Sequence, residues 1–112
     1  MAKHYPDKGD IVWIDMNPQL GHEQAGRRPA IIMSPLKYNS KVGLALVCPI
    51  TSHIKGYPFE VVIPDVFKVK GAILADQIRN ADWTARNIEL IFKAPQTLID
   101  EVQEKINAIL NG

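Results

Sequence analysis

The sequence has very little cysteine and no long apolar run, and both absences limit what the chain can be. Cys48 is the single cysteine among 112 residues, so no disulfide can form within the chain. Its neighbours are apolar, which predicts a small residue of the hydrophobic core. No apolar run is long enough to span a bilayer, and residues 1–6 lack the features of a signal peptide. We therefore expect a cytoplasmic protein with no membrane partner.

Net charge and cofactor motifs are scarce as well. The formal charge is only +1, so any attraction to nucleic acid must come from local clusters of basic residues. No spacing of His, Cys, Asp and Glu matches a metal site, and no glycine-rich phosphate-binding motif occurs. These absences predict no metal and no cofactor. The length and an ordinary hydrophobic content of 46% predict one globular domain over residues 1–112.

Short stretches rich in β-branched and aromatic residues predict a strand-rich fold. The expected strands are 11–16, 29–34, 44–50, 59–63, 69–75 and 88–92, with a further strand continuing at 76–80. The run at 44–50 is almost continuously apolar, which is typical of a central strand buried on both faces or in a barrel wall. Residues 36–41 favour a short helical turn, and 82–86 fit either a helical turn or a loop.

The last part of the chain predicts one amphipathic helix. Pro95 suits its first turn, and Leu98, Val102, Ile106 and Ile109 share one face. The turns between the strands are mostly too short for a crossover helix, which favours an antiparallel sheet. We therefore expect a mainly β fold with a C-terminal α-helix, in which a small antiparallel sheet curls into a partly open, SH3-like barrel.

The polar loop at 21–28 carries the densest group of chemically useful side chains. Arg28 precedes Pro29, so its backbone is biased towards an extended geometry and its side chain should emerge at the barrel rim. A guanidinium there can clamp a phosphate and stabilise transition-state charge, or it can simply be solvated. Glu23 can act as a general base, or can pair with Arg27 or Arg28.

A second group of polar residues follows the expected central strands. Thr51 and Ser52 end the 44–50 strand with hydroxyls, which can donate to a phosphate oxygen or can form a turn. The other polar candidates are His22, His53, Asp76, Gln77 and Arg79. The two histidines titrate near neutrality and can shuttle a proton, although loop histidines are commonly bystanders.

Several ordered segments resemble the MazF/PemK family of bacterial toxins. They are GDIVW at 9–13, GHEQAGRRP at 21–29, PIT at 49–51, GYPFEV at 56–61, LADQIR at 74–79 and KINAIL at 105–110. Together they extend along nearly the whole chain, and KGYPFEVV at 55–62 most resembles the MazF branch.

The resemblance implies the toxin of a type II toxin–antitoxin system, a sequence-specific endoribonuclease that cleaves single-stranded mRNA without a metal and so inhibits translation and growth. In this family the ribose 2′-hydroxyl attacks the adjacent phosphorus, which leaves a 2′,3′-cyclic phosphate and a 5′-hydroxyl. The reaction requires a proton acceptor, a proton donor for the leaving oxygen, and donors to the phosphoryl oxygens. A substrate 2′-hydroxyl also explains a preference for RNA over DNA.

The resemblance places the catalytic residues on the two polar groups. Arg28 and Thr51 are expected at the scissile phosphate, with Glu23 as the candidate base. The residues expected to bind RNA are Gln24, Arg27, Ser52, His53, Lys55, Asp76, Gln77 and Arg79. Some relatives carry an arginine where this chain has Leu74, so Asp76 and Gln77 are assigned to base recognition or structure rather than to catalysis.

The resemblance also implies two protein partners. One is a second copy of the chain, forming a homodimer with a groove for RNA between the subunits. The other is a MazE-like antitoxin whose acidic tail folds onto the dimer and blocks that groove. The alternative is a non-catalytic, gyrase-poisoning toxin of the CcdB type, which uses the same barrel. Those toxins carry a tryptophan close to the C-terminus, whereas the last tryptophan here is Trp83.

Overall fold

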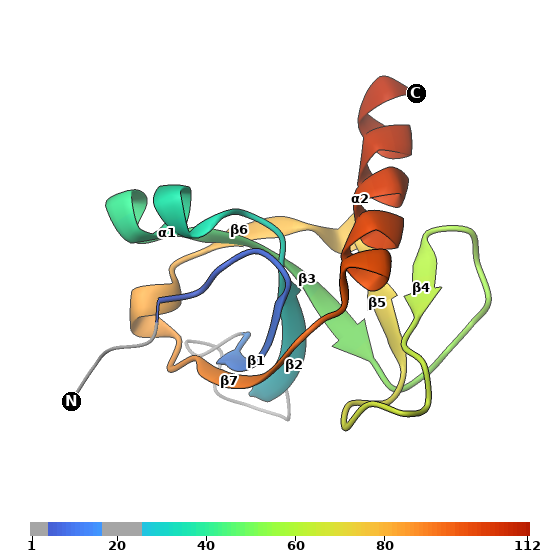
Figure 1. The fold of residues 1–112 in the computed structure, drawn as a ribbon, viewed down its shortest axis with the longest axis horizontal. Coiled ribbons are helices and arrows are strands. Elements are labelled where there is room, and N and C mark those ends of the chain that lie inside the picture. The colour runs from blue at the N-terminus through green and yellow to red at the C-terminus, as the bar shows by residue number, and fades with distance from the viewer. Residues whose placement is uncertain (1–4, 17–25) are drawn as a thin grey trace.

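The computed structural model describes residues 5–16 and 26–112, and Figure 1 shows their arrangement. In chain order the elements are β1 (Asp10–Asp15), β2 (Arg27–Ile32), α1 (Leu36–Val42), β3 (Ala45–Thr51), β4 (Glu60–Val62), β5 (Ala72–Leu74), η2 (Ala75–Gln77), β6 (Arg79–Ala81), η3 (Trp83–Ala85), β7 (Glu89–Lys93) and α2 (Gln96–Asn111). Both η segments are single turns of 3₁₀-helix.

All strand pairs are antiparallel, as the short connections predict. The sheet runs in the order β4-β5-β3-β2-β1-β7, and β3 is its centre. One edge of β3 pairs with β2, and the other edge pairs first with β6 and then with β5. Within the described ranges β4 and β7 do not pair with each other. The sheet is therefore curved but not closed, and the predicted barrel is only a loose description of it.

The hydrophobic core lies on both faces of this sheet. Successive residues of a strand point to opposite faces, so a strand that is buried on both sides must be apolar throughout. Ile31 and Cys48 belong to the face that α2 covers through Leu98, Val102 and Ile106, whereas Ile14 and Val47 belong to the other. The predictions of a doubly buried central strand, a buried Cys48 and an amphipathic C-terminal helix are confirmed.

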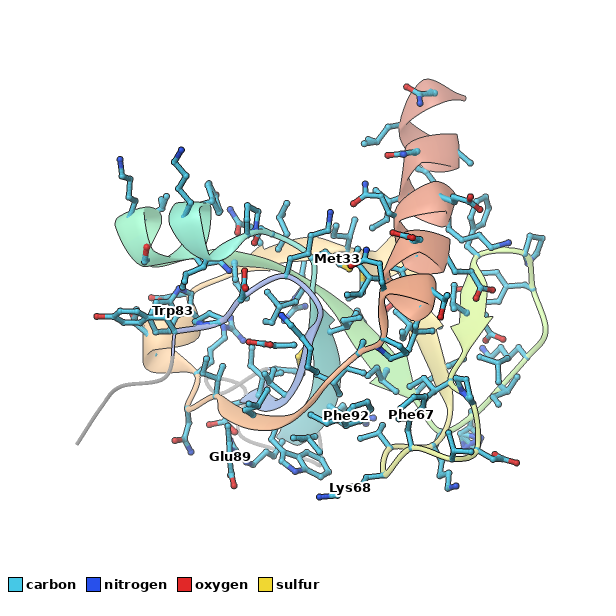
Figure 2. All side chains as sticks on the ribbon, in the orientation of Figure 1. Met33, Phe67, Lys68, Trp83, Glu89 and Phe92 are labelled. Atoms are coloured by element: carbon cyan, nitrogen blue, oxygen red, sulfur yellow. The ribbon has the colours of Figure 1, made fainter. Side chains whose placement is uncertain are left out.

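Trp83, the first residue of η3, links α1 to the second face of the sheet. The Trp83 side chain, labelled in Figure 2, is buried, and its Nε1 donates to the carbonyl oxygen of Asn39 at 3.0 Å. Asn39 is fully buried, and its side-chain amide donates to the carbonyl oxygens of Pro6 and Ser34. Gly43 then ends α1 in a left-handed conformation.

Two predicted strand boundaries are wrong in ways that matter for function. The strand expected at 29–34 begins two residues earlier, so Arg27 and Arg28 lie within β2. The strand expected to continue at 76–80 starts only at Arg79. Asp76 and Gln77 instead belong to η2, which begins at Ala75 directly after β5. None of the helices in the described ranges is long and apolar enough to cross a membrane.

Candidate functional site

The neighbouring strands β2 and β3 carry two of the predicted catalytic residues, Arg28 and Thr51, at the same end of the sheet. β2 begins beside the polar loop, and antiparallel pairing puts that beginning next to the end of β3. The β2–β3 register ends with the pair Ala30–Pro49, and Arg28 and Thr51 each lie two residues beyond that pair, at the same end of the two strands. Residues level with each other across a pair of strands point to the same face. Continued in the same register, the two strands would present the Arg28 guanidinium and the Thr51 hydroxyl on one face, and their meeting at a phosphate stays a prediction.

The Arg28 guanidinium is available for a ligand. Its side chain is exposed, and it forms no hydrogen bond or ion pair with any other residue of the described ranges. The Thr51 side chain is half-buried, and its Oγ1 accepts a hydrogen bond from the backbone N–H of His53 at 3.1 Å. A hydroxyl that accepts from its own chain keeps its proton free to donate to another oxygen.

A shallow pocket of about 100 Å³ opens beside Thr51. Its walls come from the end of β3, the loop that follows it, β4, β5 and η2. The lining residues are Thr51, His53, Lys55, Tyr57, Glu60, Leu74 and Gln77. Four residues predicted for the site therefore share one pocket, and its polar walls offer cationic, amide and hydroxyl groups to a ligand.

Besides the bond between His53 and Thr51, two carboxylates hold the loop between β3 and β4. The Glu60 carboxylate accepts hydrogen bonds from the backbone N–H groups of Lys55 and Gly56. The Tyr57 hydroxyl donates to Asp76 Oδ1 at 2.7 Å. This bond, with smaller contributions from burial and from the charges of Asp76 and Glu60, raises the pKa of the Tyr57 phenol to about 12. The phenol is therefore protonated at neutral pH, and Asp76 serves here as its acceptor.

Two of the predicted RNA-binding arginines are engaged in structural bonds. Arg27 donates to Asp15 Oδ1 at 3.1 Å, to the Asn87 carbonyl oxygen at 2.7 Å and to Glu89 Oε1 at 3.2 Å. Arg79 donates to the carbonyl oxygen of Met16, the last described residue before the polar loop. Arg27 thus links β2 to β1 and β7, and Arg79 links β6 to the end of β1. Contact of either arginine with RNA stays a prediction.

The remaining predicted residues fall into two groups. Ser52 is exposed and is the first residue of the loop that follows β3. Glu23, Gln24 and His22 lie outside the described residues.

Sequence reasoning missed three residues of the pocket, Tyr57, Glu60 and Leu74. Tyr57 resembles an ordinary core aromatic residue, and Glu60 resembles an exposed strand residue. The available signal is their spacing around Gly56, because a glycine loop followed four residues later by a carboxylate can fold back on itself. Gly56 does adopt a left-handed φ of 83°.

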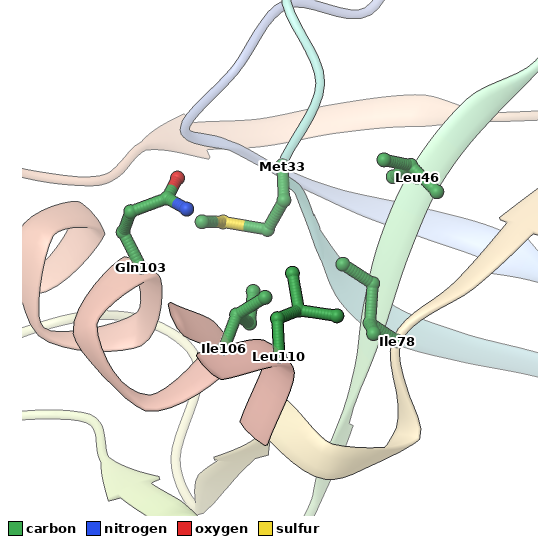
Figure 3. A pocket seen from close by; sticks show the side chains of 6 residues that line it. All are labelled: Met33, Leu46, Ile78, Gln103, Ile106 and Leu110. Carbon is green, nitrogen blue, oxygen red and sulfur yellow. The ribbon is translucent and has the colours of Figure 1, made fainter. Parts of the chain in front are cut away.

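A second, apolar cavity of about 320 Å³ lies on the other side of η2, beside α2 (Figure 3). It is lined by Met33, Leu46, Ile78, Gln103, Ile106 and Leu110. Leu110 is 76% exposed, and Figure 1 shows that the last turns of α2 project beyond the rest of the chain. An exposed leucine on a projecting helix, next to an apolar cavity, is typical of a surface that meets another protein.

Comparison with known proteins finds a matching family and several similar proteins. Residues 7–110 match a family described as the PemK-like, MazF-like toxin of type II toxin–antitoxin systems. The chain is 39% identical to the endoribonuclease toxin MazF of Escherichia coli K12 over 98% of both chains. It is 32% identical to the E. coli endoribonuclease PemK, over 93% of this chain and 81% of that protein.

Solved structures show the same likeness. The crystal structure of MazF from Deinococcus radiodurans superposes with a TM-score of 0.89 at 45% identity, over 98% of this chain and 100% of that one. A MazE–MazF complex from the same organism gives a TM-score of 0.86 at 41% identity, over 96% and 97% of the two chains.

Proposed function

The chain belongs to the PemK/MazF family of endoribonuclease toxins, and from this premise we propose that it cleaves single-stranded mRNA at specific sequences without a metal ion. Cleavage proceeds by attack of a ribose 2′-hydroxyl on the neighbouring phosphorus. The products are a 2′,3′-cyclic phosphate and a 5′-hydroxyl. Loss of intact mRNA in the cytoplasm would stop translation and growth.

The observation that supports this proposal is that Arg28 and Thr51 each lie two residues beyond the Ala30–Pro49 pair, at the same end of the neighbouring strands β2 and β3. As the 2′-oxygen bonds to phosphorus, it loses its proton to a base, and the bond from phosphorus to the 5′-oxygen breaks. Negative charge collects on the phosphoryl oxygens during this exchange. Arg28 stabilises that charge and is the candidate proton donor to the leaving 5′-oxygen, while the Thr51 hydroxyl donates to a phosphoryl oxygen. Glu23 is the candidate base.

The pocket beside Thr51 supplies the next part of the RNA site. His53 and Lys55 offer donors to phosphate and base oxygens, and Gln77 offers an amide that can read the edge of a base. Asp76 acts through Tyr57, to which it is hydrogen bonded, rather than in catalysis. Ser52, Gln24, Arg27 and Arg79 extend the surface over which the strand would pass.

We assign two protein partners. The MazE–MazF complexes of Deinococcus radiodurans support a MazE-like antitoxin, whose acidic tail would compete with RNA for the cationic site. A second copy of the chain would cover the apolar cavity beside α2, because Leu110 is exposed there and four other residues of the cavity lining are apolar. A homodimer would then present two sites.

The test is cleavage of single-stranded RNA in EDTA, with end-group analysis of the products. We expect cyclic phosphate ends from the wild-type protein and a loss of about a hundredfold to a thousandfold in kcat for Arg28→Ala, the range for removing one transition-state donor. Thr51→Ser should retain more activity than Thr51→Val because it keeps the hydroxyl. Lys37→Ala removes an exposed cation from α1 and is the matched control.

Each alternative outcome has a definite reading. Absence of cleavage by the wild-type protein would refute the ribonuclease and favour a gyrase-poisoning toxin. Cleavage that needs a divalent metal would refute the mechanism. Full activity in Arg28→Ala would move the site elsewhere on the sheet.

A further inference from the structure

The Glu60 carboxylate is the least expected group near the proposed RNA site. A carboxylate repels a phosphate because both are negatively charged, and yet Glu60 lines the pocket beside Thr51. Its side chain is 9% exposed, and burial of a carboxylate is costly unless hydrogen bonds replace its hydration. These bonds come from the loop that carries the cationic residues of the pocket.

The geometry of the bonds identifies what Glu60 holds. Its Oε1 accepts from the backbone N–H of Gly56 at 2.8 Å and from that of Lys55 at 3.1 Å, and its Oε2 accepts from Lys55 at 3.1 Å. Two successive backbone N–H groups that converge on one anion form a nest, a motif that requires a left-handed residue. Gly56 supplies it, with a φ of 83°.

Space does not explain the glycine at position 56. A Cβ atom added there would meet nothing within 4 Å, so only the left-handed backbone favours glycine. That backbone aims both N–H groups at Glu60. The loop is thus shaped around the carboxylate, and the carboxylate comes from the first residue of β4, which pairs with Leu74 of β5.

The loop in turn carries the groups that face a ligand. His53, Lys55 and Tyr57 all lie between Thr51 and Glu60 in the sequence, and all three line the pocket. Tyr57 also makes a second attachment through its hydrogen bond to Asp76. Without the nest, this stretch would be held at Tyr57 by Asp76, at His53 by the Thr51 hydroxyl, and at its two ends.

We propose that Glu60 is a positioning residue: its carboxylate fixes the backbone of Lys55 and Gly56 so that His53, Lys55 and Tyr57 line the pocket beside Thr51. The inference rests on the proposed function, since the ligand of that pocket is the RNA strand. Glu60 touches no reacting atom, and it acts by lowering the freedom of the loop before RNA binds.

The test combines RNA cleavage with amide hydrogen exchange of the dimeric protein, using Glu60→Gln and Glu60→Ala. The glutamine keeps one oxygen acceptor and loses the other, whereas the alanine loses both. Glu104→Gln removes the same charge from an exposed position on α2 and is the matched control. Thermal unfolding of each variant sets a temperature at which all of them remain folded.

We expect the amides of Lys55 and Gly56 to exchange faster in the order wild type, glutamine, alanine, while the amides of β3 stay protected. KM for RNA should rise about tenfold in Glu60→Ala, the change expected for one lost hydrogen bond, and by less in Glu60→Gln. The kcat should stay close to the wild-type value, because Arg28 and Thr51 are in place. The control should behave as the wild type in both assays.

Two results would overturn this role of Glu60. One is unchanged exchange at Lys55 and Gly56 in both variants, which would show that the carboxylate does not hold the loop. The other is faster exchange without any rise in KM, which would show that the loop does not bind RNA through this pocket. Absence of cleavage by the wild-type protein would instead overturn the proposed function, and so the two failures are distinguishable.

Discussion

Replacement of Gly71 by alanine tests whether the end of β3 must be held in place for catalysis. Gly71 is buried just before β5, and its backbone lies against that of Thr51 at the end of β3. The next residue, Ala72, pairs with Thr51 in the sheet. The φ of Gly71 is 123°, a conformation that residues with a side chain rarely adopt. Gly71 is distant from Thr51 in the sequence but in direct contact with its backbone.

The size of the effect follows from the clash. A Cβ atom at position 71 would lie 2.0 Å from the carbonyl oxygen of Thr51 and 2.9 Å from its carbonyl carbon. Backbone atoms cannot swing aside, so the strand end must move by about 1 Å, a displacement that can reduce catalysis about a hundredfold. The strained φ of an alanine at this position lowers the free energy of unfolding by about 1–3 kcal/mol more. Both kcat/KM and stability should therefore fall.

The assay is steady-state cleavage of a short single-stranded RNA, with denaturant unfolding of the same samples. Gly43→Ala is the control, because Gly43 has a φ of 76° but its added Cβ would be 3.7 Å from the nearest atom, an ordinary contact. It should lose about 1–2 kcal/mol of stability, the cost of a left-handed alanine, and keep its activity. Wild-type kcat/KM in folded Gly71→Ala would refute the claim that the backbone of Thr51 positions the site.

Three further predictions test the interface and the core. Leu110→Asp should weaken the homodimer about a hundredfold or more, since each subunit loses about 1.5–3 kcal/mol of apolar burial. Sedimentation velocity measures this change, with Val66→Asp, at a residue 85% exposed, as the control, and an unchanged dimer would place the interface elsewhere. Asn39→Ala should lower the free energy of unfolding by about 2–4 kcal/mol, because it removes the side-chain bonds to two carbonyl oxygens and to Ser34 Oγ. Urea denaturation measures this change, and a loss below about 1 kcal/mol, about that of an ordinary surface substitution, would contradict this account. Burial, with a smaller contribution from the charge of Asp76, raises the pKa of the Cys48 thiol to about 12, so iodoacetamide at pH 8 should label it only after unfolding; rapid labelling of the native protein would show that β3 opens.

The positions of Arg28 and Thr51 could be expected from the sequence, because both stand where a polar loop meets an apolar strand. Pro29 and the apolar run after it locate one strand, and the run at 44–50 locates the other. The sequence did not show that these two strands pair with each other, since an antiparallel sheet of short strands allows several strand orders. Asp76 and Gln77 illustrate the limit: their local sequence favours a strand, but in the structure they form η2 between β5 and β6.

Glu60 and Tyr57 show why part of the pocket was missed. Nothing local distinguishes a glutamate in an alternating strand from a solvated one, and its role depends on the loop that folds back over it. The cavity beside α2 was missed for a related reason. Leu46, Ile78 and Leu110 are ordinary apolar residues in three separate segments, and only packing leaves a hollow between them.

The strand-rich composition, the C-terminal helix and the family could all be inferred from the sequence, because apolar periodicity and local motifs are properties of neighbouring residues. Arg28 and Thr51 could be proposed in the same way, since their residue types suit a phosphate. The pairing of β2 with β3, the open sheet and the hydrogen bonds between Glu60 and the loop after β3 became visible only in the folded chain. Those features depend on contacts between segments far apart in the chain, whose free energies no local pattern contains.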